Sequence, residues 1–362
     1  SYMQLLKFSD AIESFDLAIA ASPTLAGAYW NKSLSLLVTG EFIEGWKLFE
    51  WRWKYAANGN KPRPFTEPVW LGEGGLEGKR ILLHGEQGLG DSLQFCRYAK
   101  AVRDLGAEVL LEVPKALMSL LSGLEGVATL VEAGKPLPAF DCHCPLMSLP
   151  LALGTTLETI PSPEGYLKAD AHKVQAWADR LGPAKRLRVG LVWNGGFRPH
   201  QPEIWAVNAR RNIELDLFAA GLQGIDADFY SLQKGEPAEG EILGREEKYW
   251  PAGNFYNHAA ELKDFSDTAA LISNLDLVIS VDTSTAHLSA ALGKPTWILN
   301  RYDTCWRWLI DREDSPWYDA VKLYRQGEDR RWEPVLARVQ TALQALAGSA
   351  HVGEGETETV LD

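Results

Sequence analysis

The fold is decided by residues 276–299, which read DLVISVDTSTAHLSAALGKPTWIL. The apolar run Leu277–Val281 predicts a buried strand, and Thr296–Leu299 predicts a second one. Between them, Thr285–Leu292 has the composition of a short helix, which Gly293-Lys294-Pro295 ends before the second strand begins. A strand, a helix and another strand joined by short connections are typical of a parallel sheet with helices on its faces.

The same alternation occurs upstream in two series, with a helical stretch ending near Leu181 between them. The later series adds strands at Leu187–Trp193 and Asp228–Leu232, and helices at Leu215–Ala220 and Thr268–Ser273. The earlier series consists of a helix at Ser92–Leu105 and strands at Lys79–His84, Val109–Val113, Val127–Val131 and near Phe140. We predict an α/β fold with two Rossmann-like domains. Because such sheets bind ligands at the carboxyl ends of their strands, we expect the active site in a cleft between the domains.

The N-terminal segment contains a short internal repeat. Phe8, Ala11 and Phe15 recur as Phe42, Gly45 and Phe49 after a shift of 34 residues. A helix–turn–helix unit of this period resembles the tetratricopeptide repeat, in which the small residue lets neighbouring helices approach closely. About one and a half units are present, whereas such arrays need ~3 units for stability. The module is therefore either a platform for an acceptor or partner, or a cap on the next domain.

Shifts in composition set the expected boundaries. The stretch at 56–77 is rich in glycine, proline and asparagine, which is typical of a linker. A helix at about Trp332–Leu346 precedes a tail rich in Gly, Ser, Glu and Thr, which we expect to be disordered. The expected parts are the helical module at 1–55, the linker at 56–77, the Rossmann-like domains at 78–165 and 166–346, and the tail at 347–362.

Charge and composition exclude several classes of protein. The formal net charge of −12 argues against a broad nucleic-acid interface, because phosphate backbones select basic surfaces. No apolar run approaches the ~18 residues that span a bilayer, and residues 1–25 lack a signal-peptide pattern, so we expect a soluble, cytoplasmic protein without a membrane span. The four cysteines lack the spacing of a zinc site or a disulfide framework. Most of the 14 tryptophans are expected to pack, with one or two lining a cleft.

The first candidate motif is GEQGLGDS at 85–92, between an expected strand and the helix after it. Its glycines permit a tight turn and let a ligand approach the main chain, so the candidate loop residues are Gln87, Gly88, Leu89 and Gly90. The spacing is neither that of GxGxxG nor that of a P-loop. Glu112 nevertheless stands where a dinucleotide site would have its ribose ligand, which keeps a dinucleotide oxidoreductase among the alternatives.

Asp91 in this motif has two interpretations. Aspartate is a common N-cap, and Asp91 stands just before the expected helix. A carboxylate at this place is also able to take a proton from an acceptor hydroxyl or amide.

The second motif follows the strand Leu277–Val281 and opens a helix whose first turn is rich in hydroxyl groups. Thr283, Ser284 and Thr285 are small, so the backbone amides stay unobstructed and predict an anion site for a diphosphate. Asp282 precedes them, and His287, one turn further, either faces the same anion or packs inward.

Two more groups follow strands of the second domain. Trp193 and Asn194 precede a polar loop with His200, Arg210 and Arg211. Arginine binds phosphate oxygens in bidentate fashion, so this loop either closes over phosphates or is a solvated surface loop. Gln233 and Lys234 come after the next strand. Lys234 either neutralises a leaving diphosphate or is an exposed loop lysine.

With these sites placed, the chain resembles a bacterial tetratricopeptide-repeat glycosyltransferase of the GT-B fold. It is similar to the lipopolysaccharide heptosyltransferases and, more distantly, to the O-linked N-acetylglucosamine transferases. The segments that carry the resemblance are GEQGLGDSLQFCRY at 85–98, VGLVWNG at 189–195, SLQKG at 231–235, residues 276–299, WRWL at 306–309 and DSPWY at 314–318.

The resemblance implies inverting transfer of a sugar from a nucleotide-diphosphate donor, with no metal ion and no cofactor other than this co-substrate. It places Asp91 at the family's proposed base and matches Asp282, Thr283 and His287 to the donor site. The domain at 78–165 would then receive the acceptor, a protein, peptide or glycan, and the domain at 166–346 the nucleotide sugar. Ser284 stands where those enzymes usually have glycine. The remaining alternatives are a non-catalytic sugar-nucleotide-binding scaffold and a GT-B-like sugar-nucleotide epimerase.

Overall fold

The computed structural model describes residues 2–59, 61–196 and 205–352, and it divides into two compact units. The first unit comprises Ser1–Lys168 and Asp303–Asp319, and the second comprises Ala169–Tyr302 and Ala320–Asp362. Residues 303–319, which we expected within the second domain, thus group with the first. Their aromatic side chains explain this, because Trp306 and Trp317 pack against residues of the N-terminal helices.

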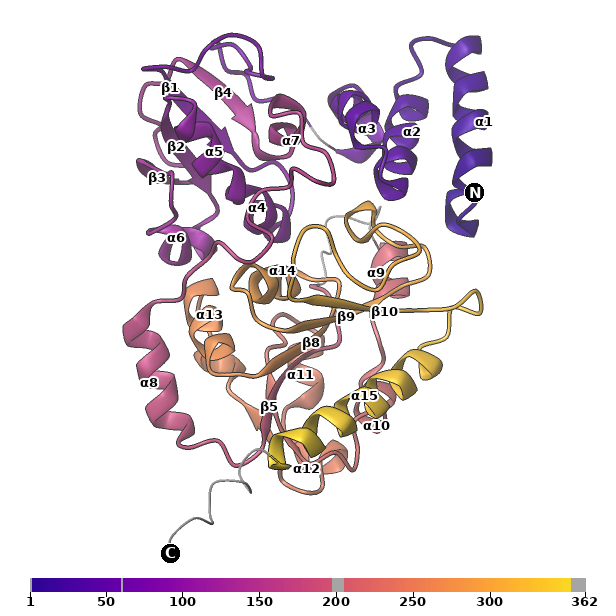
Figure 1. Ribbon diagram of the computed structural model, residues 1–362, viewed down its shortest axis with the longest axis vertical. Helices are drawn as coiled ribbons and strands as arrows, with labels where there is room; N and C mark the ends of the chain where they lie inside the picture. The colour runs from indigo at the N-terminus through magenta and orange to yellow at the C-terminus, as the bar shows by residue number, and fades with distance from the viewer. Residues whose placement is uncertain (1, 60, 197–204, 353–362) are drawn as a thin grey trace, which may run out of the picture. The chain divides into compact units, whose positions relative to one another are not determined.

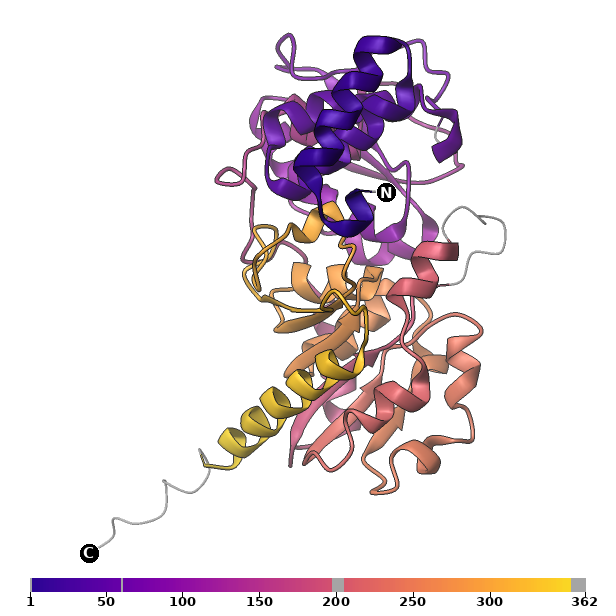
Figure 2. The same cartoon turned by 90° about the vertical axis from the view of Figure 1, so that its right-hand side faces the viewer.

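The first unit begins with three helices that lie side by side (Figures 1 and 2). These are α1 (Phe8–Ala21), α2 (Ala26–Thr39) and α3 (Phe42–Phe49). Gly40, with φ of 90°, ends α2 in the left-handed conformation that glycine adopts without strain. Gly45 lies so close to α2 that a Cβ there would stand 2.7 Å from a methyl carbon of Leu37. The predicted role of this small residue in close helix packing is confirmed.

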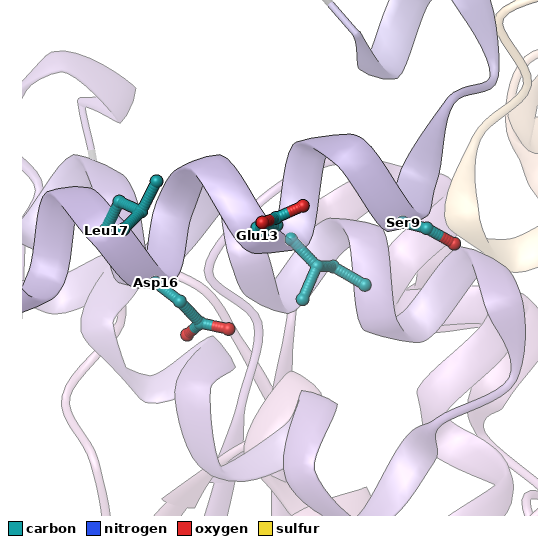
Figure 3. Close-up of a pocket in the computed structure, with 5 residues that line it drawn as sticks. Ser9, Glu13, Asp16 and Leu17 are labelled. Atoms are coloured by element: carbon teal, nitrogen blue, oxygen red, sulfur yellow. The ribbon is translucent and has the colours of Figure 1, made fainter.

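A surface hollow of about 510 Å³ lies along α1. Figure 3 shows four of its lining residues, Ser9, Glu13, Asp16 and Leu17, along the one helix. Leu17 is 68% exposed. The hollow contains none of the predicted site residues.

The α/β part of the first unit is a parallel sheet with strand order β3-β2-β1-β4. Its strands are β1 (Arg80–His84), β2 (Glu108–Val113), β3 (Thr129–Glu132) and β4 (Cys142–Pro145). Its helices are α4 (Leu89–Phe95), α5 (Ala99–Asp104), α6 (Lys115–Leu121) and α7 (Leu149–Ala152). The single helix expected at Ser92–Leu105 is therefore two helices, separated by a 3-10 turn at Cys96–Tyr98.

The second unit is built on a six-stranded parallel sheet with strand order β10-β9-β8-β5-β6-β7. Its strands are β5 (Leu187–Val192), β6 (Ala227–Ser231), β7 (Phe255–Asn257), β8 (Leu277–Val281), β9 (Thr296–Asn300) and β10 (Val321–Arg325). The predicted α/β architecture is confirmed. Among the strands of the described residues, β7 and β10, at the two edges of this sheet, were not predicted.

The helices of the second unit cover this sheet. They are α8 (Ala171–Leu181), α9 (Trp205–Arg211), α10 (Leu215–Ala220), α11 (Ala238–Ile242), α12 (Glu246–Tyr249), α13 (Phe265–Ser273), α14 (Ser284–Ala291) and α15 (Glu333–Val352). α10 and α15 contribute Phe218 and Val339 to the same hydrophobic core as the strands, while α8 and α13 lie side by side (Figure 1).

α15 continues through residues for which we expected a tail, and Ala347 is buried in the core. Its apolar spacing persists past Leu346, which explains the longer helix. Residues 353–362 lie outside the described part of the chain. In that described part, no helix combines the length and apolar character needed to cross a bilayer.

Candidate active site

The second sheet brings two loops together at the point where its strand order reverses. The chain proceeds from β5 to β6 and β7 on one side and from β8 to β9 and β10 on the other, so the switch point lies between the paired strands β5 and β8. Trp193-Asn194-Gly195 follows β5, and Asp282-Thr283 follows β8. Open α/β sheets bind ligands in the crevice at such a point. Two of the predicted donor segments are therefore neighbours.

The first turn of α14 forms one side of this place. Thr283 is the N-cap, and its Oγ1 accepts a hydrogen bond from the amide of Ala286 at 3.3 Å and lies 2.9 Å from Oγ of Ser280. Helix geometry leaves the amides of Ser284 and Thr285 without an intrahelical acceptor, and both residues are partly exposed. These N–H groups lie at the positive end of the helix dipole, which is the chemistry of an anion site.

His287 faces inward, which decides between the two interpretations of this residue. Its side chain is buried, with the residue only 4% exposed. Its Nε2 lies 3.9 Å from Oδ1 of Asp282. We therefore assign His287 a contact with Asp282 behind the first turn of α14.

Arg211 connects the two sides of the switch point. Its Nη1 donates to the carbonyl oxygen of Asp282 at 2.8 Å, and its Nη2 donates to Oδ1 of Asn208 at 2.6 Å. The guanidinium packs against Gly195, where a Cβ would stand 2.0 Å from Nη2. Arg211 ends α9, so the predicted flexible loop is helical at this end. His200 lies outside the described residues.

The buried side chains of Gln233 and Trp193 support the loop that follows β5. Gln233 is 1% exposed, and its Oε1 accepts hydrogen bonds from the amides of Trp193 and Asn194 at 3.2 and 3.0 Å. Trp193 is fully buried in the core and packs against Phe218. The sequence assigned both side chains to the donor site because they follow strands, but burial directs them into the protein. Asn194 is the partly exposed member of this group.

The ammonium of Lys234 is held by neighbouring groups. It donates to Oε1 of Glu239 at 2.9 Å and to the carbonyl oxygen of Ala259 at 2.8 Å. Burial on its own raises the pKa of Glu239, but the hydrogen bonds from Lys234 and the Gly235 amide outweigh it and lower that pKa. Lys234 is therefore already paired with a carboxylate.

In the first unit, Asp91 lies in the first turn of α4, the helix that follows β1. The helix starts at Leu89, so Asp91 is its third residue and the predicted N-cap role is wrong. Its Oδ2 accepts a hydrogen bond from the amide of Gly88 at 2.7 Å, which is one half of a capping box. Gln87 is exposed, and Gly88, Leu89 and Gly90 are partly exposed, so the loop is accessible from solvent.

Arg307 contacts the other oxygen of this carboxylate. Its Nη2 donates to Oδ1 of Asp91, and its Nε donates to Oε1 of Gln94 at 2.8 Å. Sequence reasoning missed this residue, although WRWL at 306–309 belongs to the segments that carry the family resemblance.

Glu86, in the same loop, forms a buried ion pair with Arg52. Nη2 and Nε of Arg52 donate to the two carboxylate oxygens of Glu86 at 3.0 and 3.2 Å. Arg52 is fully buried, and it also donates to Glu50 and to Oγ of Ser148, both at 2.6 Å. Burial raises the pKa of Glu86 to about 7, although the charge of Arg52 opposes this shift. The sequence analysis did not predict this pair, whose members stand 34 positions apart in the chain.

This raised pKa predicts a pH dependence of stability that Glu86→Gln should remove. The pKa of Glu86 is near 4.5 when the chain is unfolded and about 7 when it is folded, so folding takes up a proton between these values. The free energy of unfolding of the wild type should therefore fall as pH rises from 4.5 to 7, relative to the variant, by at most about 3 kcal/mol. Urea titrations at several pH values measure this difference. Parallel curves for the two proteins would contradict the assignment.

No metal centre is evident in the parts of the chain that the structure describes. Among those residues, no group of three or more His, Cys, Asp or Glu side chains is placed to hold an ion. All four cysteines are free thiols, and Cys96, Cys142 and Cys144 are buried.

Comparison with known sequences identifies part of the second unit. Residues 235–304 match glycosyltransferase family 9 (heptosyltransferase). Over 352 residues, the chain is 30% identical to Protein FlbA of Caulobacter vibrioides, and the alignment covers 90% of this chain and 56% of that protein. The chain thus spans just over half the length of this curated relative.

Solved structures resemble the chain in fold. The E. coli ADP-heptose LPS heptosyltransferase II superposes with a TM-score of 0.52 and 15% identity, covering 75% of this chain and 99% of that one. A family 9 glycosyl transferase from Veillonella parvula gives a TM-score of 0.50 and 10% identity, covering 79% and 91%. A mutant O-GlcNAc transferase of Thermobaculum terrenum is less similar, with a TM-score of 0.32 and 14% identity, covering 97% and 84%. The chain thus has the GT-B fold of these structures, and its residues 235–304 match the glycosyltransferase family 9 (heptosyltransferase) model.

Proposed function

We propose that this chain is an inverting, metal-independent glycosyltransferase, which moves a sugar from a nucleoside-diphosphate donor to a protein or glycan acceptor. The observation that supports this best is the accessible first turn of α14, beside Arg211, at the switch point of a parallel sheet. This place lies in the region that matches family 9, because residues 235–304 include α14.

In this proposal, the amides and hydroxyls of Ser284 and Thr285 bind the diphosphate. Arg211 holds the carbonyl of Asp282 and so fixes the turn that precedes them. Asn194 lines the opposite side of the switch point. As the bond to the sugar breaks, negative charge develops on the diphosphate. Fixed dipoles stabilise that charge without having to reorganise.

Asp91 is the proposed base. Each carboxylate oxygen has two lone pairs, so the hydrogen bonds from Gly88 and Arg307 leave acceptor capacity on both oxygens. Asp91 takes the proton of the acceptor hydroxyl, the acceptor oxygen forms a bond to the anomeric carbon, and the nucleoside diphosphate departs from the opposite face. Attack opposite to the leaving group inverts the configuration.

A thermal-shift panel of ADP-, UDP-, GDP- and CMP-sugars tests the donor site. ADP-heptose is the first compound to test, because the E. coli protein of the same fold is named an ADP-heptose LPS heptosyltransferase. A donor at ~100 times its dissociation constant should stabilise the protein by about 2.7 kcal/mol. No shift with any sugar nucleotide would contradict the proposal.

Nucleotide release then separates the alternatives. A transferase releases the nucleoside diphosphate only when an acceptor is present, whereas a binding scaffold stabilised by the donor releases none. An epimerase converts the sugar nucleotide without any acceptor.

A further inference from the structure

The glycine loop at 85–91 is held by two arginines that come from outside its own sheet. One is Arg52, in the 3-10 turn Glu50–Trp53 that follows α3. The other is Arg307, in the 3-10 turn Trp306–Trp308 of the returning segment. They contact the two carboxylates of the loop, Glu86 near its start and Asp91 at its end. All of these residues belong to the first unit.

Each arginine is itself fixed by several groups. Arg52 contacts Glu86 through two nitrogens and also donates to Glu50 and Ser148, so its buried guanidinium has a single geometry. Arg307 contacts Gln94 and Asp91 while its guanidinium carbon lies 4.3 Å from the ring centre of Trp306. Neither side chain resembles a solvated surface arginine, since Arg307 is only 11% exposed and Arg52 is fully buried.

The two turns that carry these arginines are connected by packed aromatic rings. Trp46 of α3 lies 5.3 Å from Trp306 and 6.4 Å from Trp317, measured between ring centres. Phe49 lies 6.1 Å from Trp306, and Phe42 lies 6.0 Å from Trp317. Three of these contacts are edge-to-face and the one between Phe42 and Trp317 is tilted, and such contacts restrict ring orientation as well as bury area. The helical module therefore carries one arginine and supports the turn that carries the other.

We propose that Arg52 and Arg307 clamp the glycine loop at both ends, and that the helical module thereby positions the carboxylate of Asp91. The inference rests on the proposed function, because it assigns the clamp to the base of that reaction. Both arginines are positioning residues, since they act through Glu86 and Asp91. The helical module is then part of the catalytic domain, whatever partner its outer surface binds.

The clamp is tested with Arg307→Gln, Arg307→Lys and Arg52→Lys, and with Arg103→Gln as the matched control. Arg103 belongs to the same unit, and its exposed side chain pairs with the exposed carboxylates of Asp104 and Glu125. Two measurements are made on each variant of the whole 362-residue chain. Hydrogen exchange reports protection of the amides at 85–92 without any substrate, and steady-state kinetics report kcat and the donor KM.

Arg307→Gln should increase amide exchange in the loop by at least ~10-fold. It should lower kcat by roughly 10–100-fold with the donor KM unchanged within about twofold, because a displaced base slows chemistry without touching the donor site. Arg307→Lys should recover part of kcat. Because both arginines hold one loop, the double variant with Arg52→Lys should lose less than the product of the two single losses.

The outcomes separate the clamp from the function on which it rests. If Arg307→Gln keeps both loop protection and kcat at the level of the control, the clamp is wrong. Strictly multiplicative losses in the double variant would also overturn it. If loop protection falls in the clamp variants while Asp91→Asn still transfers sugar at the wild-type rate, Asp91 is not the base and the clamp remains as a support of the loop.

Discussion

Asp91→Asn is expected to lower kcat for sugar transfer by roughly 10²–10⁴-fold while the affinity for the donor stays unchanged. Asparagine has nearly the same shape and retains a carbonyl oxygen that accepts one hydrogen bond, but it cannot take up the proton of an acceptor hydroxyl. Donor affinity should persist because the proposed diphosphate site belongs to α14 in the second unit. Nucleotide release with acceptor measures the loss, and thermal shift with the donor measures binding.

Asp104→Asn is the matched control for this variant. Asp104 lies in the same unit and is exposed, and it pairs with Arg103. The Asp104→Asn variant should transfer sugar at the wild-type rate. If Asp91→Asn retains more than a third of the wild-type kcat, Asp91 is not the base. Equal losses of donor binding and transfer would show instead that Asp91 supports the structure of the site.

The sequence predicts the strands in which apolar residues predominate. β8 has the predicted bounds, β5 ends one residue earlier than predicted, and β6 is shifted by one residue toward the N-terminus at both ends. All three are central strands, and their positions are apolar or small except for Arg188 in β5 and Asp228 in β6. β10 reads VKLYR and is an edge strand with an exposed lysine, so its pattern does not stand out from a loop. β7 is three residues long and too short to show any period.

For the candidate site, the sequence predicts position along the chain better than the direction of a side chain. Asn194, Ser284 and Thr285 were predicted as site residues because polar residues after parallel strands share one edge of the sheet, and all three are partly exposed. Gln233 and His287 follow strands in the same way, yet both are buried, and no local pattern distinguishes them. Their direction depends on the fit of neighbouring loops, which periodicity does not encode.

Arg307 and Arg52 show that contacts between residues far apart in the chain are not predictable from one sequence. Arg307 contacts Asp91 across 216 positions of sequence, and Arg52 contacts Glu86 across 34. Without aligned relatives, nothing in a single sequence pairs such residues. Both arginines stand beside tryptophans, at Trp51 and Trp53 and at Trp306 and Trp308. Clusters of this kind indicate buried interfaces, in which an arginine is retained only if its charge is compensated.

Trp46→Ala is expected to lower the free energy of unfolding of the first unit by about 3–5 kcal/mol. Trp46 is 2% exposed and lies among Phe42, Phe49 and Trp306. Removing the ring leaves a cavity among side chains that are themselves rigid, so the surroundings relax little. The variant also loses the hydrogen bond from Nε1 to the carbonyl oxygen of Thr155 at 3.2 Å. Urea unfolding followed by circular dichroism measures the change.

Leu17→Ala is the matched control, because Leu17 belongs to the same helical module but is exposed on α1. Its effect should stay within about 0.5 kcal/mol.

If the helical module were a separate domain attached through a surface, Trp46→Ala would unfold the module alone and leave the α/β part of the unit folded. We expect one cooperative loss instead, because Trp46 contacts the segment at 303–319 and the loop at Thr155 as well as its own helices. Two separate transitions would show that the module folds independently, and that its contact with Glu86 through Arg52 is not a condition for folding.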